Sequence, residues 1–260
     1  MAVRLGLHAD RLASVRALRT VKGRRVQSRF AFEGETLLGE ALQSDFPVEE
    51  LYATQEAYDA SPLARQLDAG GVPCFILEPA SAGHLSDLAT PNGIVAVSPV
   101  RLCPASRLFA GEGLLLVLAD VNDPANAGTL LRSADAFGCA GVVFGSLGVD
   151  PFHPKVVRGS MGAVFRLAIA VADPEEVAQA AGTRFGLLGL AAGGAGLESE
   201  RWERPVAAVV GNERHGLGRW ERLCRRLVAI PMPGPSESLS AAVAGSIALY
   251  EASRRYAAER

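Results

Sequence analysis

Short apolar runs alternate with amphipathic stretches along the second half of the chain. Residues 113–119 form a continuous apolar run, which is typical of a strand buried on both faces of a parallel sheet. Further strands are predicted at residues 141–144, 165–170, 185–191, 205–210 and 227–230. Helices are predicted at residues 126–137, 175–181, 219–226 and about 239–258. This alternation predicts an α/β fold with an open, mostly parallel sheet and helices on its faces.

The first hundred residues predict a smaller α/β unit. A helix is expected at residues 37–41, and strands are expected at residues 51–53, 74–77 and 93–97. Glycine and proline at residues 70–73 mark a turn between two of these strands. Because residues 101–113 carry Pro104 and two glycines, we expect a linker there, with domains at residues 1–105 and 106–260.

Composition limits the class of protein. The chain has 260 residues, 49% of them hydrophobic, which is enough for one large or two small cores. It lacks an apolar export signal and any apolar run near the roughly 20 residues that span a bilayer. Its four cysteines form no CxxC pair. We therefore expect a cytoplasmic protein with no metal site, no disulfides and no membrane partner.

The charge is unevenly distributed, although the net charge is only −2. The first 30 residues contain eight Lys or Arg and one acid, whereas residues 31–100 contain one base and eleven acids. A basic end of this kind predicts contact with phosphate, and Arg24, Arg25 and Arg29 are the candidate RNA-binding residues. A solvated helix face, or pairing with the acidic stretch, explains the same charges equally well.

Two nucleotide-binding motifs are missing from the sequence. The chain contains no GxxxxGK[ST], so a phosphate-binding loop of the nucleotide-hydrolysing kind is excluded. It also contains no GxGxxG. A nucleotide-linked oxidoreductase would fit the strand–helix alternation but lacks this fingerprint.

Three polar segments follow predicted strands, where parallel sheets place ligands. In residues 120–138, a turn leads into a helix that carries Asn126 and Arg132, and this arginine is either a phosphate clamp or a solvent-facing side chain. In residues 209–217, Gly211 allows a ligand to approach the backbone, although a β-to-α turn also needs glycine. In residues 230–244, three prolines make a rigid loop, and Ser236 or Ser238 is expected to cap the next helix.

Together and in this order, the three segments resemble the signature segments of the SpoU-type RNA methyltransferases of the SPOUT superfamily. The matching positions are Asp123, Pro124, Asn126, Gly128, Arg132 and Ala134, then Gly211, Glu213 and Gly216, then Ile230, Pro231, Met232, Gly234, Ser238 and Leu239. Residues 158–165 are similar to the family as well. Residues 29–34 and 90–95 resemble its RNA-substrate-binding domain, so the resemblance covers nearly the whole chain.

The resemblance implies a trefoil-knotted methyltransferase domain that moves a methyl group from S-adenosylmethionine to a ribose 2′-hydroxyl. It implies a homodimer and an RNA substrate, ribosomal rather than transfer RNA because an N-terminal RNA domain is present. The implied cofactor-binding residues are Leu190, Ala191, Gly211, Asn212, Ile230, Met232 and Leu239. The implied catalytic residues are Arg132 at the ribose hydroxyl, Asn126 shaping the pocket, Glu213 orienting its neighbours, and Ser240.

Ser240 is a departure from the family pattern, which has Asn after Ser-Leu. Serine keeps a donor and an acceptor but is shorter. The alternative function is therefore a non-catalytic RNA-binding relative that kept the fold. Asn126, Arg132 and Glu213 favour the enzyme.

Overall fold

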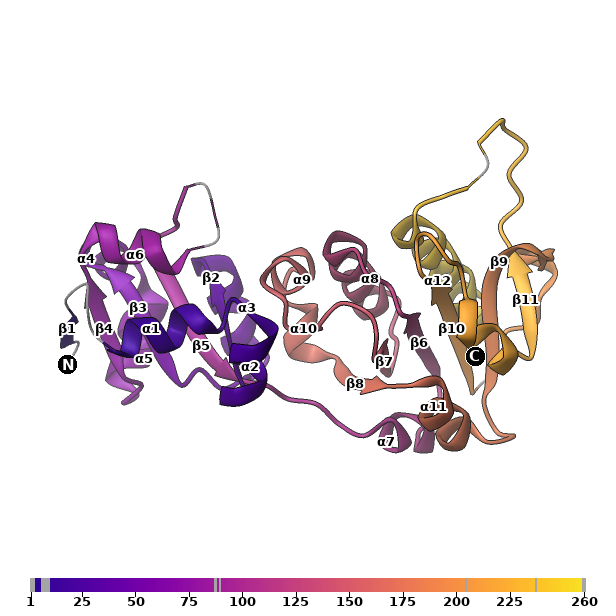
Figure 1. Cartoon of the computed structure of the whole chain (residues 1–260), viewed down its shortest axis with the longest axis horizontal. Coiled ribbons are helices and arrows are strands. Elements are labelled where there is room, and N and C mark those ends of the chain that lie inside the picture. Colours follow the sequence, from indigo (N-terminus) through magenta and orange to yellow (C-terminus); the bar gives the residue numbers. More distant parts are fainter. Residues whose placement is uncertain are drawn as a thin grey trace. The chain divides into compact units, whose positions relative to one another are not determined.

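The computed structural model describes residues 3–5, 10–86, 88, 90–203, 205–236 and 238–258. They divide into two compact units (Figure 1). The first unit contains Met1–Val100 and Phe152–Arg166, and the second contains Arg101–Pro151 and Leu167–Arg260. The predicted domain boundary after residue 105 runs close to the first of these divisions, whereas a segment from later in the chain returns to the first unit.

The first unit is built on a mixed five-stranded sheet in the order β1-β4-β3-β5-β2. Strands β1, β4 and β3 are parallel, and β5 runs antiparallel to both β3 and β2. The strands are β1 Val3–Leu5, β2 Arg29–Glu33, β3 Glu50–Thr54, β4 Cys74–Leu77 and β5 Ile94–Pro99. The helices are α1 Asp10–Ala17, α2 Val21–Gln27, α3 Glu35–Gln43, α4 Gln55–Ala60, α5 Pro62–Ala69 and α6 Pro79–Leu85.

The predicted helix and three strands of the first unit are confirmed as α3, β3, β4 and β5. Among residues 1–100, sequence patterns missed the two strands β1 and β2 and five helices. The missed helices are eight residues or shorter. Such short helices depend on tertiary packing more than on an amphipathic repeat.

The segment from Phe152 to Arg166 completes the first unit. It forms α9, Pro154–Gly159, and α10, Ala163–Arg166. The ring of Phe152 lies 4.6 Å from that of Phe30, and the ring of Phe165 lies 5.0 Å from that of Phe32 and 5.1 Å from that of Phe46. Because Phe165 belongs to this cluster, the strand predicted at residues 165–170 begins later, as β8 Ala168–Ala172.

The second unit contains an all-parallel six-stranded sheet in the order β11-β9-β10-β6-β7-β8. This confirms the predicted α/β fold with a parallel C-terminal sheet. Its other strands are β6 Leu114–Ala119, β7 Gly141–Gly145, β9 Gly186–Gly196, β10 Val206–Gly211 and β11 Arg226–Ala229. Its helices are α7 Ala105–Ala110, α8 Pro124–Ala136, α11 Pro174–Ala181 and α12 Ala241–Ala258, with 3-10 turns η1 Leu197–Ser199 and η2 Gly218–Leu223. The helix predicted at residues 219–226 is the shorter η2.

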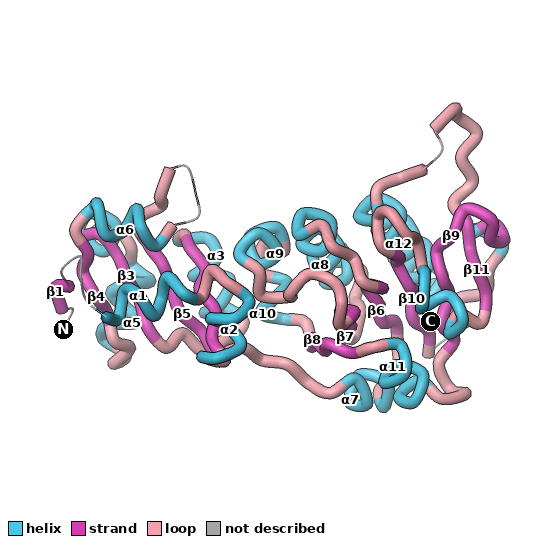
Figure 2. Tube along the Cα trace, in the orientation of Figure 1, coloured by secondary structure: helices cyan, strands magenta, loops and turns pink. Residues whose placement is uncertain are grey.

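The strand order brings two distant loops together. Strand β10 lies between β6 and β9, and Gly211 at its end pairs in register with Ala119 at the end of β6. The loops that follow β6 and β10 therefore start side by side, at the kind of strand-order reversal where open sheets bind ligands. Figure 2 shows a long third loop, which connects β11 to α12.

Helices α8 and α12 are closely packed neighbours. A Cβ atom added to Gly245 would lie 2.4 Å from Leu130 Cδ2, so a larger residue there would have to displace the Leu130 side chain. The hydroxyls of Ser133 and Ser246 are 2.7 Å apart. The small residues that the sequence places on α12 thus serve a close helix–helix approach.

Candidate active site

A pocket of about 260 Å³ opens at the carboxyl ends of β10 and β11 and beside the middle of β9. It includes all seven residues that the family resemblance implies for the cofactor: Leu190, Ala191, Gly211, Asn212, Ile230, Met232 and Leu239. Glu213 and Ser238 also line it, together with small and apolar residues of β9–β11 and α12. An apolar slot with a few polar groups suits a flat heterocyclic ligand.

The loop after β10 forms one wall of the pocket. A Cβ atom on Gly211 would lie 2.3 Å from the Gly216 carbonyl carbon, so only glycine permits this close approach. The backbone N–H of Asn212 donates to Gly216 O (2.8 Å), and the N–H of Gly216 donates to Asn212 O (2.9 Å). The loop is therefore closed by its own hydrogen bonds.

Glu213 joins this loop to the start of α8. Its carboxylate accepts a hydrogen bond from Asn126 Nδ2 (2.9 Å) and from the backbone N–H groups of Asn122 and Asp123 (3.2 Å each). Partial burial opposes the charged form, but these donors outweigh it and hold the pKa of Glu213 below its usual range. Glu213 is thus a charged acceptor that fixes Asn126 against the pocket wall.

Helix α8 presents the candidate catalytic arginine. Asp123 caps the helix by accepting from the Ala125 N–H (2.7 Å), and Pro124 occupies its first position. Arg132, farther along, is exposed. It makes no hydrogen bond or ion pair with any residue that the structure describes, so its planar guanidinium is free to bind an anion.

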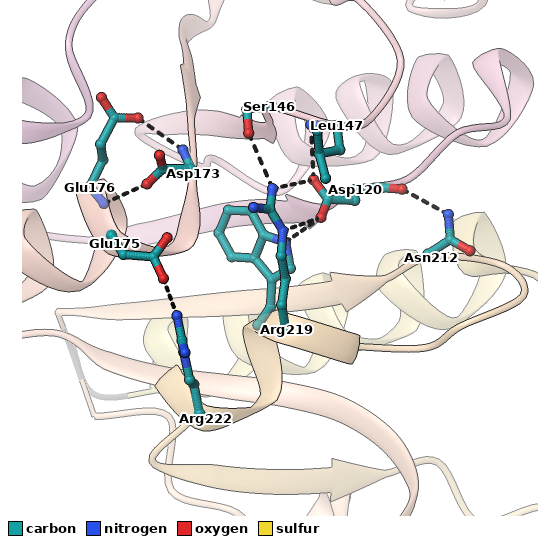
Figure 3. A network of polar contacts seen from close by, with 10 residues as sticks. Asp120, Ser146, Leu147, Asp173, Glu175, Glu176, Asn212, Arg219 and Arg222 are labelled. Atoms are coloured by element: carbon teal, nitrogen blue, oxygen red, sulfur yellow. Dashed lines mark hydrogen bonds and ion pairs between the residues drawn. The ribbon is translucent and has the colours of Figure 1, made fainter.

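Asp120 is the centre of a polar network that sequence reasoning missed (Figure 3). Its carboxylate accepts from Arg219 Nε (2.9 Å), Trp220 Nε1 (2.8 Å) and the Leu147 N–H (3.2 Å). Burial opposes its charge, but the bonds from Arg219 and Trp220 outweigh burial and keep the pKa of Asp120 below its usual range. Gly145 leaves room for this network in the structure, because a Cβ there would lie 2.3 Å from Asp120 Oδ1.

Ser240 lies beside the pocket rather than in its lining. Its hydroxyl accepts from the Val243 N–H (3.3 Å) and its carbonyl accepts from the Ala244 N–H (2.9 Å), so it caps α12. The prediction that Ser236 or Ser238 caps this helix is wrong. The reason is that α12 begins at Ala241, too far along the chain for either serine, and Ser238 lines the pocket instead.

Two of the three candidate RNA-binding arginines are held within the first unit. Arg24 is only 2% exposed, and its guanidinium donates to the carbonyls of Leu18 (2.8 Å) and Arg19 (3.1 Å). Arg29 forms ion pairs with Glu49 (2.8 Å) and Glu50 (3.0 Å). Arg24 is therefore a structural residue of the α1–α2 turn, and of the three only Arg25 is exposed.

Neither a metal site nor a membrane span is found in the described part of the chain. No group of three or more His, Cys, Asp or Glu is placed to hold a metal ion there. None of the helices described is long and apolar enough to cross a bilayer.

Comparison with protein-family models decides the family. The model of the SpoU rRNA Methylase family matches residues 113–250, and the model of the MRM3-like substrate binding domain matches residues 10–96. The chain belongs to the SpoU rRNA methylase family.

Relatives in this family include proteins named as ribosomal RNA methyltransferases. The chain is 32% identical over 237 residues to the Bacillus subtilis protein named 23S rRNA (guanosine(2553)-2'-O)-methyltransferase RlmP, covering 90% of this chain and 92% of that protein. It is 37% identical over 175 residues to the Streptomyces viridochromogenes protein named 23S rRNA (uridine(2479)-2'-O)-methyltransferase. That match covers 64% of this chain and 61% of the relative.

Solved structures of SpoU rRNA methylases share the fold over nearly the full length. The SpoU methyltransferase AviRb from Streptomyces viridochromogenes, in complex with the cofactor AdoMet, has a TM-score of 0.85 and 29% identity, covering 97% of this chain and 100% of that chain. The AdoMet-bound rRNA methyltransferase from Sinorhizobium meliloti has a TM-score of 0.84 and 27% identity, covering 98% of both chains.

Proposed function

We propose that this SpoU-family chain transfers a methyl group from S-adenosylmethionine to a ribose 2′-hydroxyl of ribosomal RNA. The observation that carries the proposal is the junction at Glu213. This one side chain lines the pocket and also hydrogen-bonds Asn126 at the start of the helix that bears Arg132. The names of the relatives as 23S rRNA 2′-O-methyltransferases support the reaction and the substrate class. Two solved structures similar to this chain contain AdoMet, which supports the cofactor.

The pocket residues fit this cofactor. Leu190, Ile230, Met232 and Leu239 provide apolar walls for an adenine ring, and the backbone at Gly211 and Asn212 provides polar groups at the edge. When bound, S-adenosylmethionine supplies an activated methyl group on a positively charged sulfur. The protein's task is to exclude water and to align the ribose oxygen with that methyl group.

Arg132 serves as a clamp and a charge stabiliser. Arginine side chains keep their positive charge in proteins, so a guanidinium does not accept the proton of the ribose hydroxyl. It can bind the neighbouring phosphate through two parallel hydrogen bonds and stabilise the oxygen as its charge develops. The hydroxyl proton then leaves to phosphate or water, while Asn126 and Glu213 keep the pocket wall in place.

The enzyme acts as a homodimer through its C-terminal half, with Arg132 next to the partner's cofactor pocket. Helix α12 supports this, because Val243, Ile247 and Tyr250 are 47%, 37% and 53% exposed and recur at helical spacing on one face. Helix α8, which carries Arg132, packs beside α12. The loops after β10 and β11 form the trefoil knot of the family, and the cytoplasm, where ribosomal RNA is found, is the site of action.

RNA is selected by the first unit through an exposed basic face. Arg16, Lys22 and Arg25 of α1 and α2 are exposed and replace Arg24 as candidate phosphate contacts. Arg29 stays a weaker candidate, because two glutamates already neutralise it. The non-catalytic alternative rested on Ser240, and the capping bonds of Ser240 give it no support.

A methyl-transfer assay with matched arginine variants tests the proposal. Ribosomal RNA from a strain that lacks this gene is incubated with the protein and S-adenosylmethionine carrying a labelled methyl group, and the modified nucleotide is mapped. Arg132→Ala should lower kcat by about 10²- to 10³-fold, comparable to removing one oxyanion-stabilising donor. Calorimetry should find its cofactor affinity within a few-fold of wild type.

Arg107→Ala is the matched control, because Arg107 is an exposed arginine on α7, which contributes no residue to the pocket. It should keep both kcat and cofactor affinity. Full turnover by Arg132→Ala, or a loss confined to cofactor binding, would contradict the role given to Arg132. A wild type that methylates no ribosomal RNA would overturn the proposed function.

A further inference from the structure

We propose that Asp120 and Arg219 form a positioning lock that sets the cofactor-pocket loop, residues 211–217, against the catalytic loop, residues 120–126. We call Asp120, Ser146, Leu147, Asn212, Arg219 and Trp220 the Asp120 lock. This inference rests on the proposed function and adds Ser146, Leu147, Arg219 and Trp220, which lie outside the three signature segments.

The lock acts on the pocket through Asn212. Neither Asp120 nor Arg219 lines the pocket, whereas Asn212 does. Asn212 Nδ2 donates to the carbonyl of Asp120 (2.8 Å), and Asn212 Oδ1 accepts from the N–H groups of Arg214 (2.9 Å) and His215 (3.2 Å). The position of the Asp120 backbone therefore determines where the pocket loop sits.

The side chain of Asp120 in turn fixes its own backbone. Asp120 has φ 56°, a left-handed conformation that aspartate tolerates better than most residues do. Its carboxylate collects donors from two other segments, the Leu147 N–H after β7 and the side chains of Arg219 and Trp220 on η2. Asp120, which follows β6, thus connects the segment after β7 with η2, as Figure 3 shows.

The contact between Asp120 and Arg219 has the geometry of a specific pair. Arg219 Nε lies 2.9 Å from Asp120 Oδ2, and a terminal nitrogen lies 3.3 Å from Oδ1, which is a bidentate arrangement. The same terminal nitrogen donates to Ser146 Oγ (3.1 Å). The carboxylate is largely shielded from solvent and rests against Trp220, which is 1% exposed. Such a pair holds an orientation, whereas an exposed pair does little.

Arg222 provides the internal contrast. It lies on the same 3-10 turn and also pairs with a carboxylate, that of Glu175. Both partners of this pair are 64% exposed, and Glu175 lies on α11, away from the pocket. Removing Arg222 takes the same charge from the same turn without touching the lock.

The experiment compares Arg219→Ala, Arg219→Lys and Asp120→Asn with Arg222→Ala in the full-length protein. Trp202→Phe is the common background, which leaves Trp220 as the reporter because the chain has two tryptophans. Three quantities are measured: Trp220 emission without ligand, the Kd for S-adenosylmethionine by calorimetry, and kcat and KM on ribosomal RNA. Asp120→Asn keeps the shape and the left-handed backbone, so a folded variant is available if Arg219→Ala is unstable.

We expect Arg219→Ala and Asp120→Asn to shift Trp220 emission, to weaken cofactor binding about tenfold and to lower kcat by roughly 10- to 100-fold, as small misplacements of reacting groups do. KM for RNA should stay within a few-fold. Arg219→Lys should recover part of the loss. The double variant Asp120→Asn/Arg219→Ala should be no more impaired than the more impaired of the two single variants, because both substitutions remove the same interaction. Arg222→Ala should match the background protein throughout.

The lock is overturned if Arg219→Ala and Asp120→Asn keep the background protein's Kd and kcat. It is also overturned if Arg222→Ala causes equal losses, or if the double variant shows the simple sum of independent effects. A background protein that binds the cofactor and methylates RNA while these variants match it refutes the lock alone. A background protein that neither binds the cofactor nor methylates RNA overturns the proposed function, and the lock with it.

Discussion

The two units use their charged side chains in different ways. Several arginines of the first unit are engaged within it: Arg11 pairs with Glu50 at 2.9 Å, Arg166 pairs with Glu40, and Arg24 binds carbonyls. In the second unit, acids at the strand ends also accept donors from the pocket loops, as Glu213 does, while Arg132 has no described partner. Ion pairs connect elements in both units, but in the second unit the charged groups also hold the pocket loops in place.

The two units also differ in which parts of the chain complete their cores. The helices that pack on the parallel sheet of the second unit, α7, α8 and α12 among them, belong to the same unit. The first unit needs Phe152 and Phe165, which come from a segment between two strands of the other sheet. Residues 1–100 alone lack one side of their aromatic cluster, so the unit that matches the substrate binding domain depends on a part of the chain within the methylase family match.

The largest expected effect would break that dependence. Phe165→Ala removes a ring that contacts both Phe32 and Phe46, and we expect it to destabilise the first unit by about 3–5 kcal/mol. Hydrogen exchange resolved by residue should show faster exchange in β2, β3 and β5 and unchanged protection in β6 and β10. Native-state exchange is suitable because it separates the stability of the two units.

Val26→Ala is the control for this variant, since Val26 is 77% exposed and its truncation should change stability by less than about 0.5 kcal/mol. If Phe165→Ala loosened both sheets equally, the two units would unfold as one, and the division between them would have no energetic meaning.

A smaller effect should separate two adjacent arginines. Arg24→Ala leaves the carbonyls of Leu18 and Arg19 without their buried donor and should cost about 1–3 kcal/mol. Arg25→Ala should leave stability within about 0.5 kcal/mol. It should instead flatten the salt dependence of RNA binding by about 0.7 to 0.9 in log–log slope, the effect of one lost phosphate contact. Thermal unfolding and RNA titrations at several salt concentrations measure both effects.

The reverse result would be informative. If Arg24→Ala changed the salt slope and Arg25→Ala changed stability, the α1–α2 turn would have a different arrangement in solution. If neither changed the slope, the basic N-terminus would be a solvated face without an RNA role.

The sequence predicted some parts of the site through the family resemblance. It implied that Glu213 orients its neighbours, and Glu213 accepts a hydrogen bond from Asn126 and lines the pocket with Gly211. The Asp120 lock was missed because its partners are 27 to 100 residues away and follow no periodic pattern. Arg24 was misjudged for a related reason. Its charge alone does not indicate that its side chain is buried against the carbonyls of Leu18 and Arg19.

The smallest expected effect concerns Ser240, where this chain departs from the family's asparagine. Because Ser240 caps α12 through the Val243 N–H, Ser240→Ala should destabilise the second unit by about 1 kcal/mol. Ser240→Asn should be nearly neutral for stability, since asparagine and serine are comparable caps, and it should change kcat only modestly. Urea denaturation followed by Trp220 fluorescence, with kcat measured on the same preparations, checks both. If the wild type were inactive on every RNA and Ser240→Asn active, the serine would have removed a catalytic contact as well as replaced a cap. The non-catalytic relative would then be the correct description, because retained capping would account for the fold and not for the lost reaction.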